Sequence, residues 1–277
     1  MLLDDTKREL QRLDIRAKKG LGQNFLVDEH ALGSIVSAVG LTHDDLAVEV
    51  GPGLGVLTQE LAASAGRVIA VELDRTMVAT LRKKFADSSN VEIVEADILS
   101  WDPESFIPDD ISYKVVGALP YNIASAVLRH FLEAKHKPAL IVAVMQKEVA
   151  QSVAAQPGDM GILSVGVQLY GCPSIVEYIP PTSFYPPPKV DSAIVRIDVY
   201  QKPAVEVEDE VVFFDVVRGG FSTPRKQLRN SLSHGLEITT AEAGVLLDIA
   251  AIDPRRRAET LSLEEWGALY RAFVGKI

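Results

Sequence analysis

Short runs of β-branched residues alternate with helix-like segments along most of the chain, and this alternation limits the possible folds more than any other feature. Five buried strands are expected at LAVEV (46–50), RVIAVEL (67–73), VEIVEA (91–96), YKVVG (113–117) and ALIVAVM (139–145). Helices are expected between or after them, near 56–64, 75–86, 123–134 and 146–155. Strands that alternate with helices are typical of βαβ units built on a parallel sheet. We therefore predict an α/β fold.

Two further strands are expected at LSVGVQLYG (163–171) and SAIVRIDVY (192–200), with no helix between them. At least one of them must then pair antiparallel at the end of the sheet. An earlier helix is expected to begin after the N-cap residue Asp28 and to end at Gly40. The sequence thus predicts a seven-stranded sheet.

The pattern changes after Tyr200, where strand signals stop. Beyond the acidic stretch 205–210, four helices are expected at 209–220, 224–233, 241–249 and 262–274. The last helix opens with the capping-box spacing of Ser262 and Glu265. We predict two domains, an α/β domain over 1–204 and a small all-helical domain over 205–277.

The charge distribution leaves the kind of partner open. The net charge is −10, which argues against a polyanionic partner because Lys and Arg supply most of the affinity for a phosphate backbone. Basic residues nevertheless cluster, and the clusters are Arg16, Lys18 and Lys19; Arg218, Arg225, Lys226 and Arg229; and residues 254–257. These clusters could face one nucleic acid or could simply be solvated surfaces.

The cysteine count and the apolar runs indicate the cellular compartment and exclude disulfides and cysteine-cluster metal sites. The single cysteine, Cys172, excludes an internal disulfide and a cysteine-cluster metal site. No metal site is expected. The N-terminus lacks a signal-peptide pattern, and the longest apolar runs are too short to span a bilayer. We expect a cytoplasmic protein with no membrane partner.

The segment EVGPGLGVLT (49–58) sits where the first strand of the sheet should pass into a helix. Gly51 and Gly53 let the backbone turn tightly there and approach a ligand. The acidic residue Glu72 follows about 20 residues later, where a carboxylate can accept hydrogen bonds from ribose hydroxyls. This pattern predicts a nucleoside-containing cofactor, and it fits NAD and S-adenosylmethionine (SAM) equally well.

The third strand separates these two cofactors. It ends in EADI, so that Asp97 stands at the strand tip and can accept a hydrogen bond from an adenine amino group. With Glu49 and Glu72 at the first two strands and Asp97 at the third, each of three consecutive strands has an acidic residue at its end. This layout is typical of a class I SAM-dependent methyltransferase with a Rossmann-like sheet, whereas nothing in the sequence points to a hydride-transfer residue.

The loop GALPYNI (117–123) follows the fourth strand and lies at the same edge of the predicted sheet. Together with GQNFL (22–26), QKEV (146–149), GILSV (161–165), SFYPPPKVDSAIVR (183–196) and FSTPRKQLRNSL (221–232), it resembles the ribosomal RNA small-subunit adenine dimethyltransferases, the KsgA family. The resemblance extends over nearly the whole chain. It implies SAM-dependent dimethylation of N6 in two adjacent adenosines of the 3′-terminal stem-loop of 16S rRNA, within the immature 30S subunit rather than free RNA. The oligomeric state stays open, with a monomer favoured.

The resemblance also implies roles for individual residues, with residues 1–204 holding SAM and residues 205–277 holding rRNA. The expected cofactor contacts are Gln23, Asn24, Leu26, Glu49, Gly51, Gly53, Glu72, Asp97 and Ala118. The residues expected at the target adenine are Ala118, Leu119, Pro120, Tyr121 and Phe184, with Tyr121 and Phe184 as aromatic walls. The residues expected to contact rRNA are Arg225, Lys226 and Arg229.

Ala118 departs from the family pattern, which has Asn at this position. One of the two acceptors for the target amine is therefore absent, and the Pro120 carbonyl remains. The chain could be an inactivated variant, an enzyme in which water or Asn122 substitutes, or a paralogue that binds rRNA without methylating it. Asn122 is expected to point into the following helix. Two other functions stay open: a 23S rRNA adenine methyltransferase of the macrolide-resistance type, and a non-catalytic assembly factor.

Overall fold

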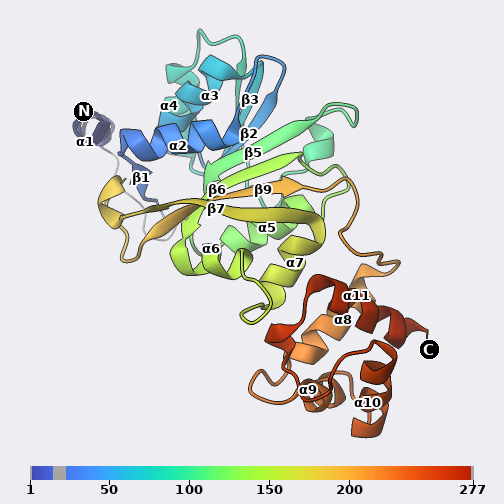
Figure 1. Cartoon of the computed structure of the whole chain (residues 1–277). Helices are drawn as coiled ribbons and strands as arrows, with labels where there is room; N and C mark the ends of the chain where they lie inside the picture. Colours follow the sequence, from blue (N-terminus) through green and yellow to red (C-terminus); the bar gives the residue numbers. More distant parts are fainter. Residues whose placement is uncertain (1, 15–22, 276–277) are drawn as a thin grey trace. The chain divides into compact units, whose positions relative to one another are not determined.

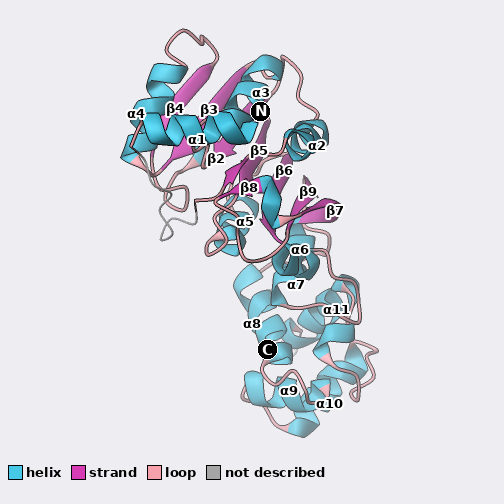
Figure 2. Ribbon diagram, turned by 90° about the vertical axis from the view of Figure 1, so that its left-hand side faces the viewer, coloured by secondary structure: helices cyan, strands magenta, loops and turns pink. Residues whose placement is uncertain are grey.

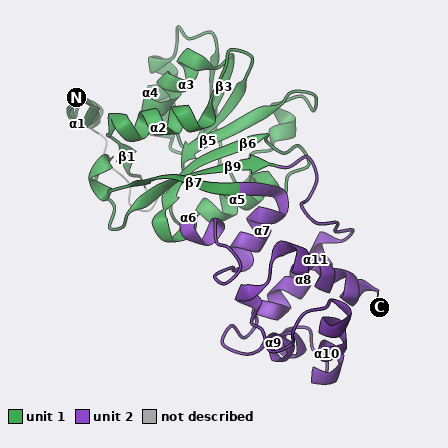
Figure 3. Ribbon diagram, viewed as in Figure 1, with its two compact units in different colours: residues 1–150, 173–199 green, residues 151–172, 200–277 purple. Residues whose placement is uncertain are grey.

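The computed structural model describes residues 2–14 and 23–275, which form two compact units (Figure 3). The first unit comprises Met1–Ala150 and Pro173–Val199, and the second comprises Gln151–Cys172 and Tyr200–Ile277. The division near residue 200 lies close to the expected domain boundary. The segment 151–172, which the sequence assigned to the α/β domain, instead belongs to the second compact unit.

The first unit is built on a seven-stranded sheet (Figure 1). In spatial order, its strands are β4 (Val91–Glu95), β3 (Arg67–Glu72), β2 (Leu46–Val50), β5 (Tyr113–Ala118), β6 (Leu140–Gln146), β9 (Ser192–Val199) and β7 (Gly171–Ile179). The strands from β4 to β6 pair in parallel, and β9 pairs antiparallel with β6. The predicted Rossmann-like sheet with an antiparallel end is confirmed. Because β2 to β5 are parallel, their carboxyl ends share one edge.

Among the described residues, six α-helices belong wholly or mainly to this unit: α1 (Leu2–Arg12), α2 (Glu29–Val39), α3 (Val56–Ser64), α4 (Arg75–Lys84), α5 (Ala124–Leu132) and α6 (Lys147–Val153). The predicted caps of α2 are confirmed. Asp28 accepts the backbone N–H groups of His30 and Ala31, and Gly40 ends the helix with a φ of 56°. Helix α1 was not expected from the sequence.

The core on one side of the sheet joins α2 and α3 to the strands. Ile35 from α2 and Leu61 from α3 pack in the same buried cluster as Val116 of β5 and Val142 of β6. The two-stranded pair β1 (Phe25–Leu26) and β8 (Phe184–Tyr185) adds to this cluster, with Leu26 opposite Phe184. This pairing brings together the segments GQNFL and SFYPPPKV, which are far apart in the sequence.

The expected strand over 163–171 is wrong, because this segment forms helix α7 (Ile162–Tyr170). The missing strand is β7, which begins at the next residue. A short apolar run fits a buried helix as well as a buried strand. The local start signal is Ser164, whose hydroxyl accepts the Gly161 N–H at 2.7 Å and donates to the Gly161 carbonyl at 2.8 Å.

Regular structure in the described part of residues 200–277 consists of helices (Figure 2). These are α8 (Glu210–Phe221), α9 (Leu228–Gly235), α10 (Thr240–Ile249) and α11 (Leu263–Val274), together with one short 3₁₀ turn. The capping box of Ser262 and Glu265 is present at the start of α11, as predicted. Among the described residues, we find no helix with the length and apolar character needed to cross a membrane.

Candidate active site

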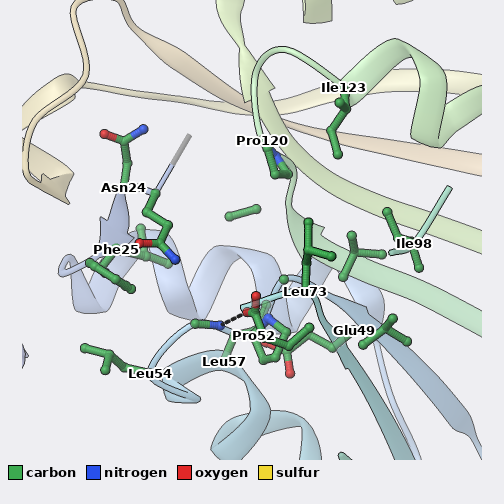
Figure 4. Close-up of a pocket in the computed structure, with 18 of the residues that line it drawn as sticks. Asn24, Phe25, Glu49, Pro52, Leu54, Leu57, Leu73, Ile98, Pro120 and Ile123 are labelled. Atoms are coloured by element: carbon green, nitrogen blue, oxygen red, sulfur yellow. Dashed lines mark hydrogen bonds between the residues drawn. The ribbon is translucent and has the colours of Figure 1, made fainter. Parts of the chain in front are cut away.

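A cavity of about 240 Å³ opens at the carboxyl edge of the parallel strands in the first unit (Figure 4). Residues that follow β2, β3, β4 and β5 line it, as do residues of the segment that leads into β1. Figure 4 shows Asn24, Pro52, Ile98 and Pro120 arranged around this hollow. The edge at which the sequence predicted a ligand is therefore hollow.

The glycine turn after β2 forms the floor of the cavity. Gly51 and Gly53 have φ angles of 67° and 56°, which side chains other than glycine rarely adopt. A Cβ on Gly53 would lie 3.2 Å from the ring of Phe25. The Gly51 N–H donates to the carbonyl of Val71 at 3.0 Å, which joins the turn to β3. The turn leaves bare backbone facing the cavity.

Lys84, at the end of α4, holds the other side of this turn. Its ammonium donates to the carbonyl of Leu54 at 2.9 Å and to the carbonyl of Gly55 at 3.2 Å. Burial lowers the Lys84 pKa, while the carboxylates of Glu9 and Glu49 raise it. Sequence reasoning missed this residue, because nothing in its local sequence shows that the end of α4 meets the glycine turn.

Glu72, the last residue of β3, is fixed by two backbone groups. Its Oε2 accepts the N–H of Gly53 at 3.2 Å, and its Oε1 accepts the N–H of Asp74 at 2.8 Å. Burial raises the Glu72 pKa. Each carboxylate oxygen has a second lone pair, so the bonds that fix the side chain leave acceptor capacity for a ligand.

Glu49 lies next to the turn and is only 1% exposed. Burial is the main cause that raises the pKa of its carboxyl to about 8, and the nearby Glu72 carboxylate adds to the shift. Its Oε2 atom has no hydrogen-bond partner among the described residues. A buried polar atom without a partner is costly, and it marks a place where a ligand can donate a hydrogen bond.

The third acid, Asp97, lines the cavity two residues after the end of β4. It is exposed, and its Oδ1 accepts the N–H of Leu99 at 3.0 Å. Leu73, which directly follows Glu72, and Leu99 also line the cavity, although they are 52% and 38% exposed. Acidic and apolar side chains therefore lie at the same part of the cavity lining, a combination that suits a flat polar ring. The leucines were missed, although their place beside the strand-end acids was a usable signal.

The loop after β5 forms another wall. Ala118 and Pro120 line the cavity, whereas Leu119 is buried and donates its N–H to the Val144 carbonyl at 2.9 Å. The Pro120 carbonyl accepts the N–H of Ile123 at 3.0 Å, which closes a tight turn. One lone pair of that carbonyl remains for a ligand.

Tyr121 and Asn122 occupy the two corners of this turn. The Tyr121 hydroxyl lies 2.6 Å from Ser192 Oγ, the side chain is half-buried, and burial raises the Tyr121 pKa. Tyr121 does not line the cavity, whereas Asn122 is exposed and does. The expectation that Asn122 is directed into the following helix is therefore wrong.

The remaining candidates divide between the cavity and the core. Gln23, Asn24 and Leu26 line the cavity, and Gln23 Nε2 donates to Asp74 Oδ2 at 3.2 Å. Phe184 is 4% exposed and packs in the hydrophobic core. The structure thus does not bring the expected second aromatic wall to the cavity, and the stacking role of Phe184 stays a prediction.

Basic side chains gather separately in the helical unit. Arg225 and Lys226 are exposed in the turn before α9, and exposed Arg229 lies in its first turn. Only Arg229 is therefore on the helix that the sequence was expected to form from residue 224. The Arg229 N–H donates to the Pro254 carbonyl at 3.3 Å and the Leu228 N–H to the Arg256 carbonyl at 2.7 Å. These bonds place the basic segment 254–257 beside the start of α9.

The residues around the cavity fit SAM. The glycine turn offers bare backbone, Glu49 offers an unsatisfied acceptor, and Glu72 and Asp97 offer carboxylate oxygens at successive strand ends. Among the described residues, no cluster of His, Cys, Asp and Glu is arranged to bind a metal. This fold and site define a SAM-dependent methyltransferase with a Rossmann-like catalytic domain.

Comparison with protein families narrows the class. The family model described as ribosomal RNA adenine dimethylase matches residues 15–271. The chain belongs to this family, and it is an rRNA adenine dimethyltransferase that uses SAM as the methyl donor.

Curated relatives over nearly the full length carry the name ribosomal RNA small subunit methyltransferase A. One from Dehalococcoides mccartyi (strain CBDB1) is 48% identical over 99% of this chain and 94% of its own length. One from Geobacter metallireducens (strain ATCC 53774 / DSM 7210 / GS-15) is 44% identical over 94% of this chain and 96% of its own length. These relatives support the small-subunit prediction.

Solved structures agree on the fold. The 23S rRNA methyltransferase ErmE is 29% identical, with a TM-score of 0.73 over 90% of this chain and 99% of that chain. A dimethyladenosine transferase from Plasmodium falciparum is 22% identical, with a TM-score of 0.79 over 91% of this chain and 98% of that chain. The predicted fold class is therefore confirmed. The 23S alternative has no better support than the small-subunit function, given the higher identity of the small-subunit relatives.

Proposed function

We propose that this enzyme dimethylates N6 of two adjacent adenosines in the 3′-terminal stem-loop of 16S rRNA, acting on the immature 30S subunit in the cytoplasm. The observation that carries the proposal is the shared cavity edge, where the glycine turn, the strand-end acids and the Pro-Tyr loop lie together. The full-length similarity to small-subunit methyltransferases supports the choice of rRNA.

Residues of the cavity would hold SAM in four places. Glu72 would accept from the ribose, and Asp97, whose Oδ1 also takes the Leu99 N–H, would accept from the adenine amino group. Leu73 and Leu99 flank the adenine ring. The part of SAM that lies at the glycine turn contacts Glu49, Gly51 and Gly53. The lining residues Gln23, Asn24, Leu26 and Ala118 contact the methionyl part.

The loop 118–123 would hold the target adenine. The N6 nitrogen is a poor nucleophile because its lone pair is delocalised into the ring, so acceptors for its hydrogens are needed to direct the lone pair. The free lone pair of the Pro120 carbonyl supplies one acceptor. Leu119 anchors the loop through Val144, and Tyr121 borders the base from its position beside Ser192.

Bound SAM supplies the methyl group through its sulfonium. In each transfer, the N6 lone pair forms the new N–C bond while the S–C bond breaks and its electron pair stays on sulfur. One proton leaves N6 for solvent. Two such transfers give N6,N6-dimethyladenosine. The chain has to position N6 against the methyl group of SAM.

A basic surface of the helical unit would hold the rRNA backbone. We define it by five exposed residues: Arg225, Lys226, Arg229, Arg255 and Arg257. The backbone bonds from Leu228 and Arg229 hold the two segments side by side. Concentrated basic charge on one surface accounts for polyanion binding by a chain of net charge −10.

Transfer of labelled methyl from SAM to unmethylated 30S and 50S subunits tests the proposal, with primer extension to locate the product. We expect label in two adjacent adenosines of 16S rRNA and tighter binding to 30S subunits than to a naked stem-loop. Label in 23S rRNA would instead establish the alternative. Absence of transfer by both this chain and its Ala118→Asn variant would refute the proposal. A monomer is expected by light scattering.

A further inference from the structure

The side chain at the second corner of the Pro120–Ile123 turn suggests how the enzyme tolerates Ala118. The methyl group of Ala118 cannot accept a hydrogen bond, so the loop lacks an acceptor at that position. Asn122 is exposed, lines the same cavity, and makes no hydrogen bond to any described residue through its side chain. A polar amide that has no partner among the described residues and lies two positions from Pro120 is available to a substrate.

Other amides of the cavity are less suited to this role. Gln23 is engaged with Asp74 at 3.2 Å, and Asn24 also has an interaction within the protein. Both belong to the segment before β1 and not to the loop that carries Pro120. Asn122 is two residues from Pro120 in the closed turn, and its neighbour Ile123 also lines the cavity.

The turn itself separates the two corner residues. Tyr121 is committed to Ser192, at 2.6 Å, while Asn122 stays in the cavity lining. We propose, on the basis of the proposed function, that the Asn122 side-chain oxygen accepts a hydrogen bond from N6 of the target adenosine and replaces the acceptor that Ala118 lacks. Asn122 and the Pro120 carbonyl then bind the two hydrogens of the unmethylated amine.

This arrangement makes the first and second transfers unequal. The unmethylated N6 has two hydrogens, and the monomethylated N6 has one. Loss of Asn122 leaves the Pro120 carbonyl, which suffices for one hydrogen. Asn122→Ala should therefore slow the first transfer more than the second, and the ratio of monomethyl to dimethyl product should fall. A general disturbance of the loop would slow both.

Single-turnover methyl transfer to unmethylated 30S subunits tests the proposal, with the SAM dissociation constant and the melting temperature measured for each variant. We expect Asn122→Ala to lower the rate by about 10² to 10³, as for loss of one preorganised hydrogen bond, with SAM affinity within about twofold of the wild type. Asn122→Asp keeps an acceptor and should stay well above Asn122→Leu, which has a similar size and no acceptor.

Ala118→Asn provides the rescue. In the Asn122→Ala background this second substitution should raise the rate at least about tenfold, and by a larger factor than in the wild-type background, where Asn122 already supplies an acceptor. A wild-type rate for Asn122→Ala would overturn the inference, as would a gain of about a hundredfold from Ala118→Asn alone. If neither the wild type nor Ala118→Asn transfers methyl to 30S subunits, the proposed function fails and this inference falls with it.

Discussion

The hydroxyl of Tyr121 lies 2.6 Å from the hydroxyl of Ser192, which joins the Pro-Tyr loop to the first residue of β9. Ser192 is completely buried, and Tyr121 is half-buried. The loop at the cavity is thus anchored to the antiparallel end of the sheet by a side-chain bond between residues 71 positions apart.

Ser192→Ala should destabilise the protein by about 1–3 kcal/mol, because the partly buried Tyr121 hydroxyl loses its partner. Urea unfolding measures this change. Tyr121→Phe in the Ser192→Ala background removes both polar groups and should recover part of the loss. A double-mutant cycle with no coupling between the two positions would show that this hydrogen bond contributes nothing to stability.

Lys84→Met should weaken SAM binding without unfolding the enzyme. The ammonium bonds two carbonyls of the glycine turn, at Leu54 and Gly55, and a charged donor contributes about 1.5–3 kcal/mol. Part of that free energy should appear as a several-fold to hundredfold rise in the SAM dissociation constant, measured by calorimetry. Lys84→Arg keeps donors at this position and should lose less. Equal affinity in Lys84→Met and the wild type would contradict a role for Lys84 in shaping the turn.

Glu49→Gln should change how stability depends on pH. The Glu49 pKa is raised to about 8 in the folded chain, above its ordinary value of 4.5, chiefly by burial. At a pH between 4.5 and about 8, the folded chain keeps a proton on Glu49 that the unfolded chain has released. Rising pH therefore lowers the free energy of unfolding, by at most about 1.4 kcal/mol per pH unit. Above about pH 8 this dependence ends.

The amide of Gln cannot ionise, so Glu49→Gln removes this contribution. The stability of the variant relative to the wild type should rise from pH 5 to about pH 8, as measured by urea unfolding without SAM. A difference that stays constant over this range would mean that Glu49 is already ionised in the folded protein near pH 5.

Arg256→Met should destabilise the helical unit by about 1–3 kcal/mol. Arg256 donates to Glu265 and to the Thr260 carbonyl, which ties the segment before α11 to the helix. Trp266 is fully buried in α11 and reports unfolding of this unit by fluorescence in a Trp101→Phe background.

Arg255→Met is the matched control for this measurement. Arg255 is exposed and bonds only to Asp253 among the described residues. Its replacement should change stability by less than about 0.5 kcal/mol and should weaken rRNA binding, since Arg255 belongs to the proposed basic surface. Equal destabilisation by both variants would refute this division of roles.

Several features were predictable because their causes are local. The strand LAVEV was placed correctly at 46–50, and the caps at Asp28, Gly40 and Ser262 lie where the sequence placed them. The convergence of Glu49, Glu72 and Asp97 at one cavity was also predictable, because parallel strands end at a common edge.

Other features depend on which distant segments pack together. The run 163–171 is apolar enough for either a helix or a strand, and residues 162–170 of the structure form the helix α7. Phe184 was expected at the target base, but the pairing of β8 with β1 places it in the core. The contact of Lys84 with the glycine turn depends on the packing of α4 against that turn. The place of Asn122 in the cavity lining depends on the turn that Pro120 and Ile123 close.

The sequence by itself therefore determined the alternating α/β fold, the edge of the sheet at which the cavity lies, and the family. Hydrophobic periodicity, glycine positions and strand-end acids act within a few residues, so they can be read along the chain. Tertiary structure decided which side chains reach the cavity, which enter the core and which anchor the loops. Those outcomes depend on close packing between segments that are far apart in sequence.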